Sequence, residues 1–588
     1  MGIGLGDAVA LAGGGGGAGA APDPNLPPVI KSVVEIGGKK LSDDMEKLLA
    51  SVTVIDRLRM PDAFVLVFRD EMHTALETAG IKIGQKVKIQ TTMPGGDALK
   101  ELISGEVTSI EAEYDLLGVR AVVRGYDFLH RLSAGRKTKT WTNVTYADVV
   151  QEIVTAAHLD AEMDSSGGTL DHVIQGNVSD LDFLYQISQK VGFDISVEDK
   201  TLHFKKPTKA STAPAAPGNT DVDKPTQMRW GKRLLEFRAR MSAVSQVTDV
   251  KVRGWNVKDR KAVIGEAKAE TESTKLKMSP ADLANAVGGE TLVVVDRPVG
   301  EQGAAGDMAK AIADQVASAA YEATAIAIGS PELKAGVAVP VSNVDPALTG
   351  NWVISTARHE FGAGAYRTYL EFSGRQDRSL HGLVSGGLSV PAARTSIPGV
   401  VIAQVTKNDD PDKQGRVKVK YPWMDDKAES FWARIARPAA GKDAGFLWIP
   451  DIDEEVVVGF EHGDLAYPLV LGSLWNGQAK MPSVLAGSVD NGKVQVHGIV
   501  SPAGHKVMFY DKKDDAGIML ITADKKVTIR LSEGEKELTI ETEGAIKIKS
   551  TGDIEMKAGG AMKLEASKSL DIKASGSMTL KGAKVGIN

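Results

Sequence analysis

Near the C-terminus, hydrophobic and polar residues follow a repeat of eight residues. Five consecutive copies run from residue 544 to residue 583, and the third and fifth positions of every copy are apolar, with a polar residue between them. Alternation with period two predicts short β-strands, and the small residues between them predict regular corners. The ten apolar positions are Ile546, Ile548, Ile554, Met556, Met562, Leu564, Leu570, Ile572, Met578 and Leu580.

These octads need partners outside their own chain. A β-helix wound from one chain needs three faces per coil, so five octads make fewer than two coils, whereas a solenoid needs about three repeats. Three chains wound around one axis solve this problem, because neighbouring chains complete the ladders of each strand. We therefore predict a homotrimeric shaft whose core is formed by the ten apolar side chains. An amphipathic β-meander within one chain is the alternative, and Leu538 with Ile540 is a candidate sixth copy.

The first half of the chain mixes strand and helix patterns. Two segments have apolar residues at helical spacing, 146–157 with Thr145 as its N-cap and 180–191. The alanine-rich segment 303–328 predicts a third helix, with Met308, Ile312 and Val316 facing inward. Short runs rich in β-branched residues predict strands at 52–56, 63–68, 86–90, 120–125, 193–199 and 201–204.

Proline, glycine and lysine mark the breaks between these regions. Residues 1–28 hold a run of five glycines and predict a flexible tail; they lack the basic start of a secretory signal. Residues 205–227 predict a long exposed loop, and residues 383–398 predict a linker. Between that linker and residue 477 lies a β-rich block.

Composition and charge exclude several functions. The chain of 588 residues has no cysteine, so it has neither disulfides nor a cysteine-based zinc site. Its net charge of −6 gives no general attraction for nucleic acid or for an anionic membrane. No run of 18 apolar residues predicts a membrane-spanning helix. Lysines outnumber acidic residues at the polar octad positions, which fits a solvated outer face that resists pairing between strand edges.

The sequence contains no convincing catalytic motif. His359-Glu360 lacks the second histidine of a metalloprotease helix, and Ser385 lies outside a nucleophile elbow. His130 is interpreted as a packing or hydrogen-bonding residue. Residues 399–477 hold nine basic against thirteen acidic residues, so the tryptophans there are expected to be structural and not to bind nucleic acid. We expect no catalytic residue, cofactor or metal.

Three stretches resemble the spike–hub proteins of contractile injection machines, which include the VgrG proteins and phage tail spikes. The first is VRGYDFLHRLSAGRKTKTW (123–141) with QGNVSDLDFLYQISQKVGFDISV (175–197), which resembles the hub of the family. The second is QGRVKVKYPW (414–423), FWARIARP (431–438), GFLWIPDIDEEVVVGFEHGD (445–464) and PLVLGSLWNG (468–477), which resembles its OB-fold neck. Asp453 departs from the glycine often found there. The third is the octad region.

The resemblance implies a mainly β fold with minor α. Its parts would be a tube-like trimeric hub with helical insertions at 29–382, an OB-fold neck at 399–477, and a C-terminal intertwined triangular β-helix at 478–588. It also implies a non-enzymatic spike that joins the inner tube and baseplate to a tip and punctures a target envelope when the sheath contracts. The implied partners are two further copies, the tube protein, baseplate proteins, a PAAR-type tip protein and effector cargo.

The implied place of assembly is the bacterial cytoplasm, within a phage-tail-like particle that can act outside the cell. The resemblance is to a family that serves extracellular injection particles, phage tails and type VI secretion alike. Two alternatives from other classes are a trimeric tailspike enzyme that degrades glycans and an adhesin shaft. A glycan-degrading tailspike would need paired carboxylates along a long β-helix groove. The five octads are too few and too narrow for such a groove.

Overall fold

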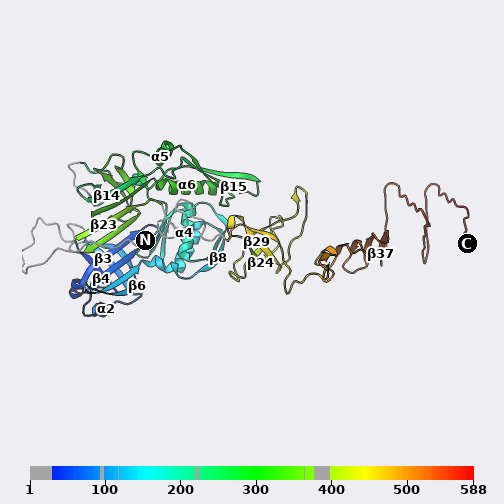
Figure 1. Ribbon diagram of the computed structural model, residues 1–588, viewed down its shortest axis with the longest axis horizontal. Coiled ribbons are helices and arrows are strands. Elements are labelled where there is room, and N and C mark those ends of the chain that lie inside the picture. Colours follow the sequence, from blue (N-terminus) through cyan, green and yellow to red (C-terminus); the bar gives the residue numbers. More distant parts are fainter. Residues whose placement is uncertain are drawn as a thin grey trace, which may run out of the picture. The chain divides into compact units, whose positions relative to one another are not determined.

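The computed structural model describes residues 30–92, 98–116, 118–218, 224–362, 365–375 and 397–587 (Figure 1). The predicted tail 1–28 and nearly all of the predicted linker 383–398, including Ser385, lie outside the described residues. The chain divides into two compact units, Met1–Leu474 and Trp475–Asn588. With 41% strand and 13% helix, the predicted mainly β fold with minor α is confirmed.

A sheet of eleven strands forms the framework of the first unit. The predicted strands 52–56, 63–68, 86–90 and 120–125 all lie in it, and every neighbouring pair is antiparallel. In order across the sheet, the strands are β14 (Leu234–Met241), β19 (Tyr321–Ile328), β23 (Ala365–Phe372), β22 (Thr356–Gly362), β3 (Leu49–Arg57), β4 (Ala63–Arg69), β7 (Gly118–Tyr126), β6 (Leu99–Asp115), β5 (Lys86–Thr92), β1 (Ser32–Ile36) and β2 (Lys39–Lys40).

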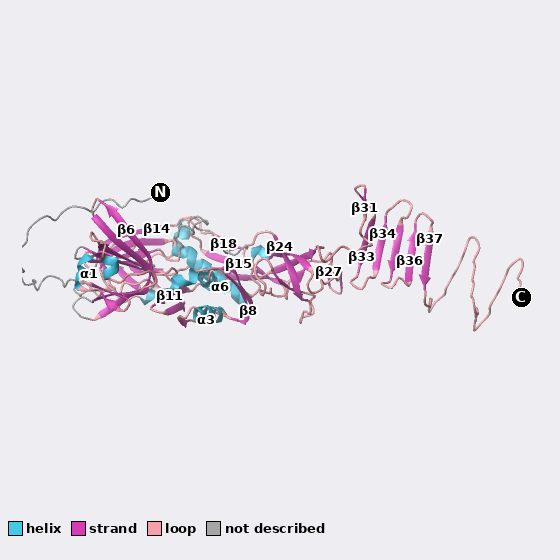
Figure 2. Cartoon of the chain, turned by 90° about the horizontal axis from the view of Figure 1, so that it is seen from below, coloured by secondary structure: helices cyan, strands magenta, loops and turns pink. Residues whose placement is uncertain are grey.

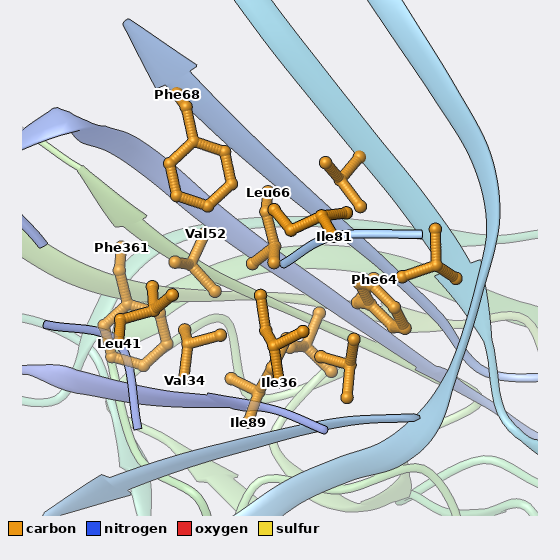
Figure 3. Packing of buried hydrophobic residues seen from close by; sticks show 14 of the residues in the cluster. Val34, Ile36, Leu41, Val52, Phe64, Leu66, Phe68, Ile81, Ile89 and Phe361 are labelled. Carbon is orange, nitrogen blue, oxygen red and sulfur yellow. The ribbon is translucent and has the colours of Figure 1, made fainter. Parts of the chain in front are cut away.

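Alternation along β3 and β4 builds the first core. Val52 and Val54 face the same side as Phe64, Leu66 and Phe68, and all five are buried. Figure 3 shows the labelled members of this cluster converging between the strands. Two short helices flank the sheet, α1 (Asp43–Leu48) and α2 (Ala75–Thr78).

A second core surrounds the two predicted helices, which are confirmed as α3 (Tyr146–Ala156) and α4 (Asp180–Val191). Thr145 caps α3 as predicted, since its hydroxyl accepts from the Asp148 N–H and the Asp148 carboxylate accepts from the Thr145 N–H. The other elements here are η1 (Phe128–Ser133), β8 (Lys137–Val144), β9 (Asp160–Met163), β10 (Leu170–Val178), β11 (Asp194–Glu198) and β12 (Thr201–Lys205).

The predicted helix 303–328 is wrong in its last third. Helix α6 (Gln302–Ser318) ends before Tyr321, and the rest of the segment is the strand β19. Alanine favours helix locally, but Tyr321, Ala323, Ala325 and Ala327 alternate inward, and β19 pairs with both β14 and β23. Tertiary pairing therefore overrides local propensity. Within α6, Ile312 and Val316 are buried as predicted, and Met308 is partly buried.

Two smaller sheets complete this part. Helix α6 covers β15 (Asp249–Asn256), β16 (Lys261–Lys268) and β18 (Thr291–Val294). The other sheet holds β13 (Met228–Arg229), β20 (Ala338–Ser342), β21 (Gly350–Val353) and β17 (Thr274–Lys275), with α5 (Pro280–Ala286) nearby in sequence. The predicted exposed loop 205–227 is only partly exposed, because Ala210 in η2 (Ala210–Thr212) is buried against Ala338 and Val353.

The predicted β-rich block after residue 399 folds around a five-stranded sheet in the order β25-β24-β29-β30-β26. We call residues 397–474 the neck block. Its elements are β24 (Val400–Lys407), β25 (Lys418–Lys420), β26 (Arg434–Ile435), β27 (Ala440–Gly441), β28 (Ala444–Gly445), β29 (Glu455–Phe460), η3 (Glu461–Gly463) and β30 (Pro468–Ser473).

The second unit is a single-layered meander followed by the octads (Figure 2). Its strands are β31 (Val489–Asp490), β32 (Lys493–Val494), β33 (Val496–Val500), β34 (Lys506–Tyr510), β35 (Gly517–Ile521), β36 (Val527–Ser532) and β37 (Glu537–Thr542). Residues 544–587 contain no assigned strand. Across the described ranges, no helix combines the length and apolarity needed to cross a membrane.

Candidate assembly surfaces

The ten predicted core residues of the octads all face solvent in a single chain. Their exposed fractions run from 50% for Met562 to 73% for Ile548. Because residues 544–587 form no strand within the chain, a meander closed on itself does not describe the octads. The structure therefore leaves these side chains and the octad backbone without the partners that burial and ladders require.

The meander before the octads carries the same kind of apolar face. Each of its strands β33 to β37 places two residues, separated by one, on this face, and the ladder registers align them in two rows. One row is Ile499, Val507, Leu520, Ile529 and Ile540, and the other is His497, Phe509, Ile518, Leu531 and Leu538. Seven of the nine apolar side chains in these rows are 39–58% exposed, somewhat less than those of the octads, and Val507 and Ile529 are partly buried.

Sequence reasoning missed most of this face. It singled out Leu538 and Ile540 as one more octad, whereas both lie in β37 and pair with β36 in the same chain. The sequence of the meander does contain pairs of apolar residues two positions apart. Successive pairs are nine to eleven residues apart, and this irregular spacing is less conspicuous than the strict period of the octads. The strands are longer here, so the hairpins can pair within one chain.

The first hub motif builds a buried turn. Asp127 accepts from the Leu129 N–H at 2.9 Å and caps η1, while its other oxygen accepts from the Asp62 N–H at 3.0 Å. His130 Nδ1 lies 2.5 Å from the Asp127 carbonyl oxygen, and its Nε2 lies 3.2 Å from the Glu106 carboxylate. His130 is thus a hydrogen-bonding residue, as the sequence indicates.

Three carboxyl groups of the hub lie close together in a poorly solvated region. Burial raises the pKa of Asp127 to about 7 and that of Asp56 to about 6, and it also raises the pKa of Asp62. The negative charge of Asp56 further raises the pKa of Asp62 and of Asp127, because a neighbouring negative charge disfavours ionisation. They also serve the fold, since Asp56 accepts from the Ala335 N–H at 3.0 Å.

The second hub motif fixes the start and end of α4. Ser179 caps the helix by accepting from the Asp182 N–H at 3.1 Å, and the Gln175 amide donates to the buried Asp180 carboxylate at 3.0 Å. Lys137 from β8 neutralises Asp180 at 2.5 Å. Gly192 ends the helix at φ 72°, a conformation that favours glycine. The spacing of this motif therefore serves the fold.

The neck motif is held by a charged cluster around Arg416. Its guanidinium donates to both oxygens of the buried Asp410, at 2.7 and 3.0 Å, and lies over the Trp432 ring. These hydrogen bonds hold the pKa of Asp410 well below its usual range. Asp453 adopts the left-handed region at φ 71°, which aspartate tolerates, so replacing the usual glycine preserves the turn.

The remaining polar candidates have structural partners. His359 is buried in the sheet, with its Nδ1 2.8 Å from the Tyr366 hydroxyl, and burial lowers its pKa to about 3. Among the described residues, no group of three His, Asp or Glu side chains is arranged to hold a metal ion. The strongest functional feature is therefore the exposed apolar surface of the second unit.

Comparison with known proteins gives the family. The family model described as the Alg8 N-terminal domain matches residues 29–362, which is more than half of the 588 residues. The chain belongs to the Alg8 N-terminal domain family. A second family model, the type VI secretion system/phage-baseplate injector OB domain, matches residues 401–475. The predicted OB fold of this block is confirmed.

Curated relatives are spike proteins. The spike protein VgrG1c of Pseudomonas aeruginosa is 29% identical over 152 residues, which cover 25% of this chain and 21% of that protein. The actin cross-linking toxin VgrG1 of Vibrio cholerae is 28% identical over 171 residues, which cover 26% of this chain and 15% of the toxin. The chain thus spans about a fifth or less of these relatives. The predicted resemblance to VgrG spike proteins is confirmed.

One solved structure aligns with the chain at low identity and a low TM-score. The E. coli c3393 protein, a type VI secretion component described as similar to the T4 tail proteins gp27 and gp5, aligns over 75% of this chain and 99% of its own at 15% identity, with a TM-score of 0.44.

Proposed function

We propose that three copies of this chain form the central spike of a contractile injection machine. The observation that carries the proposal is the exposed apolar surface of the second unit, in both the octads and the meander. Turning these faces toward one axis buries the apolar side chains and lets neighbouring chains complete the octad ladders. The ten octad residues then form the core of a triangular prism.

Such a prism suits mechanical work. Its ladders run between chains, so bending or opening it requires many hydrogen bonds to fail together. Lys547 and Lys563 lie between the two apolar positions of their octads, and Lys557 and Lys573 directly follow the second one, so all four face outward in this arrangement. They keep the outer surface solvated and discourage pairing with foreign strands. The prism is expected to resist proteases and detergent for kinetic reasons.

The hub and neck connect this shaft to the machine. Three hubs would form a ring that continues the inner tube, and the OB blocks would narrow it toward the prism. By similarity to spike proteins, the further partners are baseplate proteins, a PAAR-type tip protein, effector cargo and, transiently, the target envelope. The particle assembles in the bacterial cytoplasm and is driven into that envelope by sheath contraction.

The chain acts without catalysis in this proposal. One relative is named a toxin, but the similarity covers only 15% of it. The comparisons give no support to the glycan-degrading alternative. Incubation with surface polysaccharides followed by an assay for new reducing ends tests that alternative directly, and the proposal expects none.

Light scattering on the purified chain tests the assembly. Each copy has a mass of 62.3 kDa, so the proposal expects a species of three times that mass that persists on dilution. A monomer at every concentration would refute the spike. A trimer that stays intact during SDS electrophoresis of unboiled samples would agree with a shaft whose chains are intertwined.

A further inference from the structure

The neck block carries an exposed arm. Strands β27 and β28 form a hairpin through Ala440–Gly445 and Gly441–Ala444 pairs, and the Phe446 N–H extends it to the Ala439 carbonyl at 3.0 Å. Residues 438–448 are all exposed. We call these residues the arm; β27 is labelled in Figure 2.

The base of the arm is strongly apolar. Phe446 and Trp448 stack with ring centroids 6.5 Å apart, and Leu447 between them is 70% exposed. The only charges in the arm are Lys442 and Asp443 at its tip, and they have opposite signs. An exposed run of three large apolar side chains in one short segment is typical of a binding anchor.

The same block carries an uncovered apolar sheet face. Val400 and Ile402 of β24 and Leu471 of β30 are large, apolar and exposed. Gly459 of β29 lies between two of them, since a Cβ there would be 3.5 Å from Leu471 Cδ1 and 3.9 Å from Val400 Cγ1. The missing side chain leaves a shallow site bordered by apolar groups. We call these four residues the neck face.

We infer that the arm of one copy covers the neck face of the next copy in the trimer. Both surfaces are exposed in one chain, so the arm does not cover its own neck face. An interface is heterologous when one copy contributes one patch and the next copy contributes a different patch. In a closed ring of three copies, every arm and every neck face is then used once. The inference rests on the proposed trimer and names the surfaces through which its necks meet.

The chemical similarity of the arm and the neck face supports a second copy of the chain as the binding partner. Both surfaces are apolar and uncharged at their centres, which is typical of the buried middle of an oligomer interface. The second unit, which contains the proposed shaft, begins at Trp475, two residues after β30 ends, so a trimer of second units would hold three neck blocks at high effective concentration. Weak apolar contacts are sufficient under those conditions.

Cysteine crosslinking tests the contact. The natural chain has no cysteine, so introduced thiols are the only ones present. The double variant V400C/L447C changes two exposed side chains, one on each surface. A disulfide needs the two Cα atoms within about 7 Å. After mild oxidation of the full chain, we expect a covalent trimer as the main band on a non-reducing denaturing gel, which a reductant returns to monomers.

Two controls separate the outcomes. The pair L235C/L447C places one thiol on β14, where Leu235 is also exposed, and should give at least tenfold less covalent trimer. Co-expressed V400C and L447C chains carrying different tags should give a covalent heterodimer, which a bond within one chain cannot produce. Trimers by light scattering without crosslinks would overturn this inference but leave the spike standing. Monomers by light scattering would overturn the spike itself.

Discussion

At the scale of single residues, the hub depends on buried charges that the sequence pattern does not reveal. Arg375 follows β23 and is only 8% exposed. It lies 3.2 Å from Asp194 of β11 and 3.4 Å from Asp314 of α6, and it donates to the Phe193 carbonyl at 3.1 Å. One guanidinium thus joins three parts of the hub that lie far apart in sequence.

Replacing this arginine should destabilise the hub strongly. Arg375→Met removes the positive charge, so Asp314 loses its ion pair and Asp194 keeps only the longer contact to Arg59 at 3.7 Å. Loss of such a buried partner costs about 3–5 kcal/mol. Urea unfolding followed by tryptophan fluorescence measures the loss. Lys47→Met is the matched control, because its ion pair with Asp44 is fully on the surface and should change stability by less than about 1 kcal/mol. Equal effects of the two changes would contradict this account.

The buried carboxyls predict a pH dependence. The folded pKa of Asp56 is about 6, above the value of 3.8 for an ordinary aspartate, so folding favours the protonated form. The favourable contribution of Asp56 to the free energy of unfolding is complete below about pH 4 and is lost as the pH rises through 6. Asp56→Asn keeps an oxygen for the Ala335 N–H but cannot ionise. Between pH 4 and pH 7 this variant should lose less stability than the parent chain, as measured by urea midpoints; parallel profiles would contradict it.

At the scale of elements, local sequence patterns predicted several strands and two helices correctly. Strands β3, β4, β5 and β7 of the eleven-stranded sheet, helices α3 and α4 and the Thr145 cap follow from apolar spacing and capping chemistry alone. The error at 319–328 has a clear cause, because alanine carries little information on burial and β19 is fixed by β14 and β23. The meander face was missed because its apolar pairs recur at intervals that vary from nine to eleven residues.

The octad pattern predicts opposite effects on trimer stability for substitutions at two adjacent positions. Met562→Asp would place one charge from each chain in the apolar core of the proposed prism, where an unpaired charge is very costly. Lys563→Asp changes the adjacent outward position and should be tolerated. We expect the first variant to dissociate in SDS more than tenfold faster than the parent trimer, and the second to match it. Similar behaviour of both variants would refute the alternation that defines the core.

At the scale of the whole molecule, the two units differ in how they satisfy their hydrophobic residues. The first unit buries its own cores around residues such as Leu66, Leu184 and Trp352. The second unit leaves most of its large apolar side chains exposed and buries only Leu485 and Met508 among those that the structure describes. We therefore expect the first unit to fold alone and the second to gain most of its stability in the proposed trimer.

Removing the octads tests this division. Deletion of residues 544–588 should leave the hub and neck folded, because their cores lie within Met1–Leu474. The product should be a monomer, or a trimer that dissociates on dilution, in light scattering at several concentrations. Circular dichroism gives the control that the first unit is intact. A trimer of the deleted chain that withstands heat and SDS would show that the octads do not lock the assembly.

The sequence by itself determined the octad periodicity, the helices at 146–157 and 180–191, the β-rich nature of the chain and its resemblance to spike proteins, because each depends on local spacing or on a contiguous motif. Only the tertiary structure decided that 321–328 is a strand, that the meander shares an apolar face, and that Arg375 joins distant elements. These features depend on which segments become neighbours across hundreds of residues, and pairing between such segments leaves no periodic trace in either one.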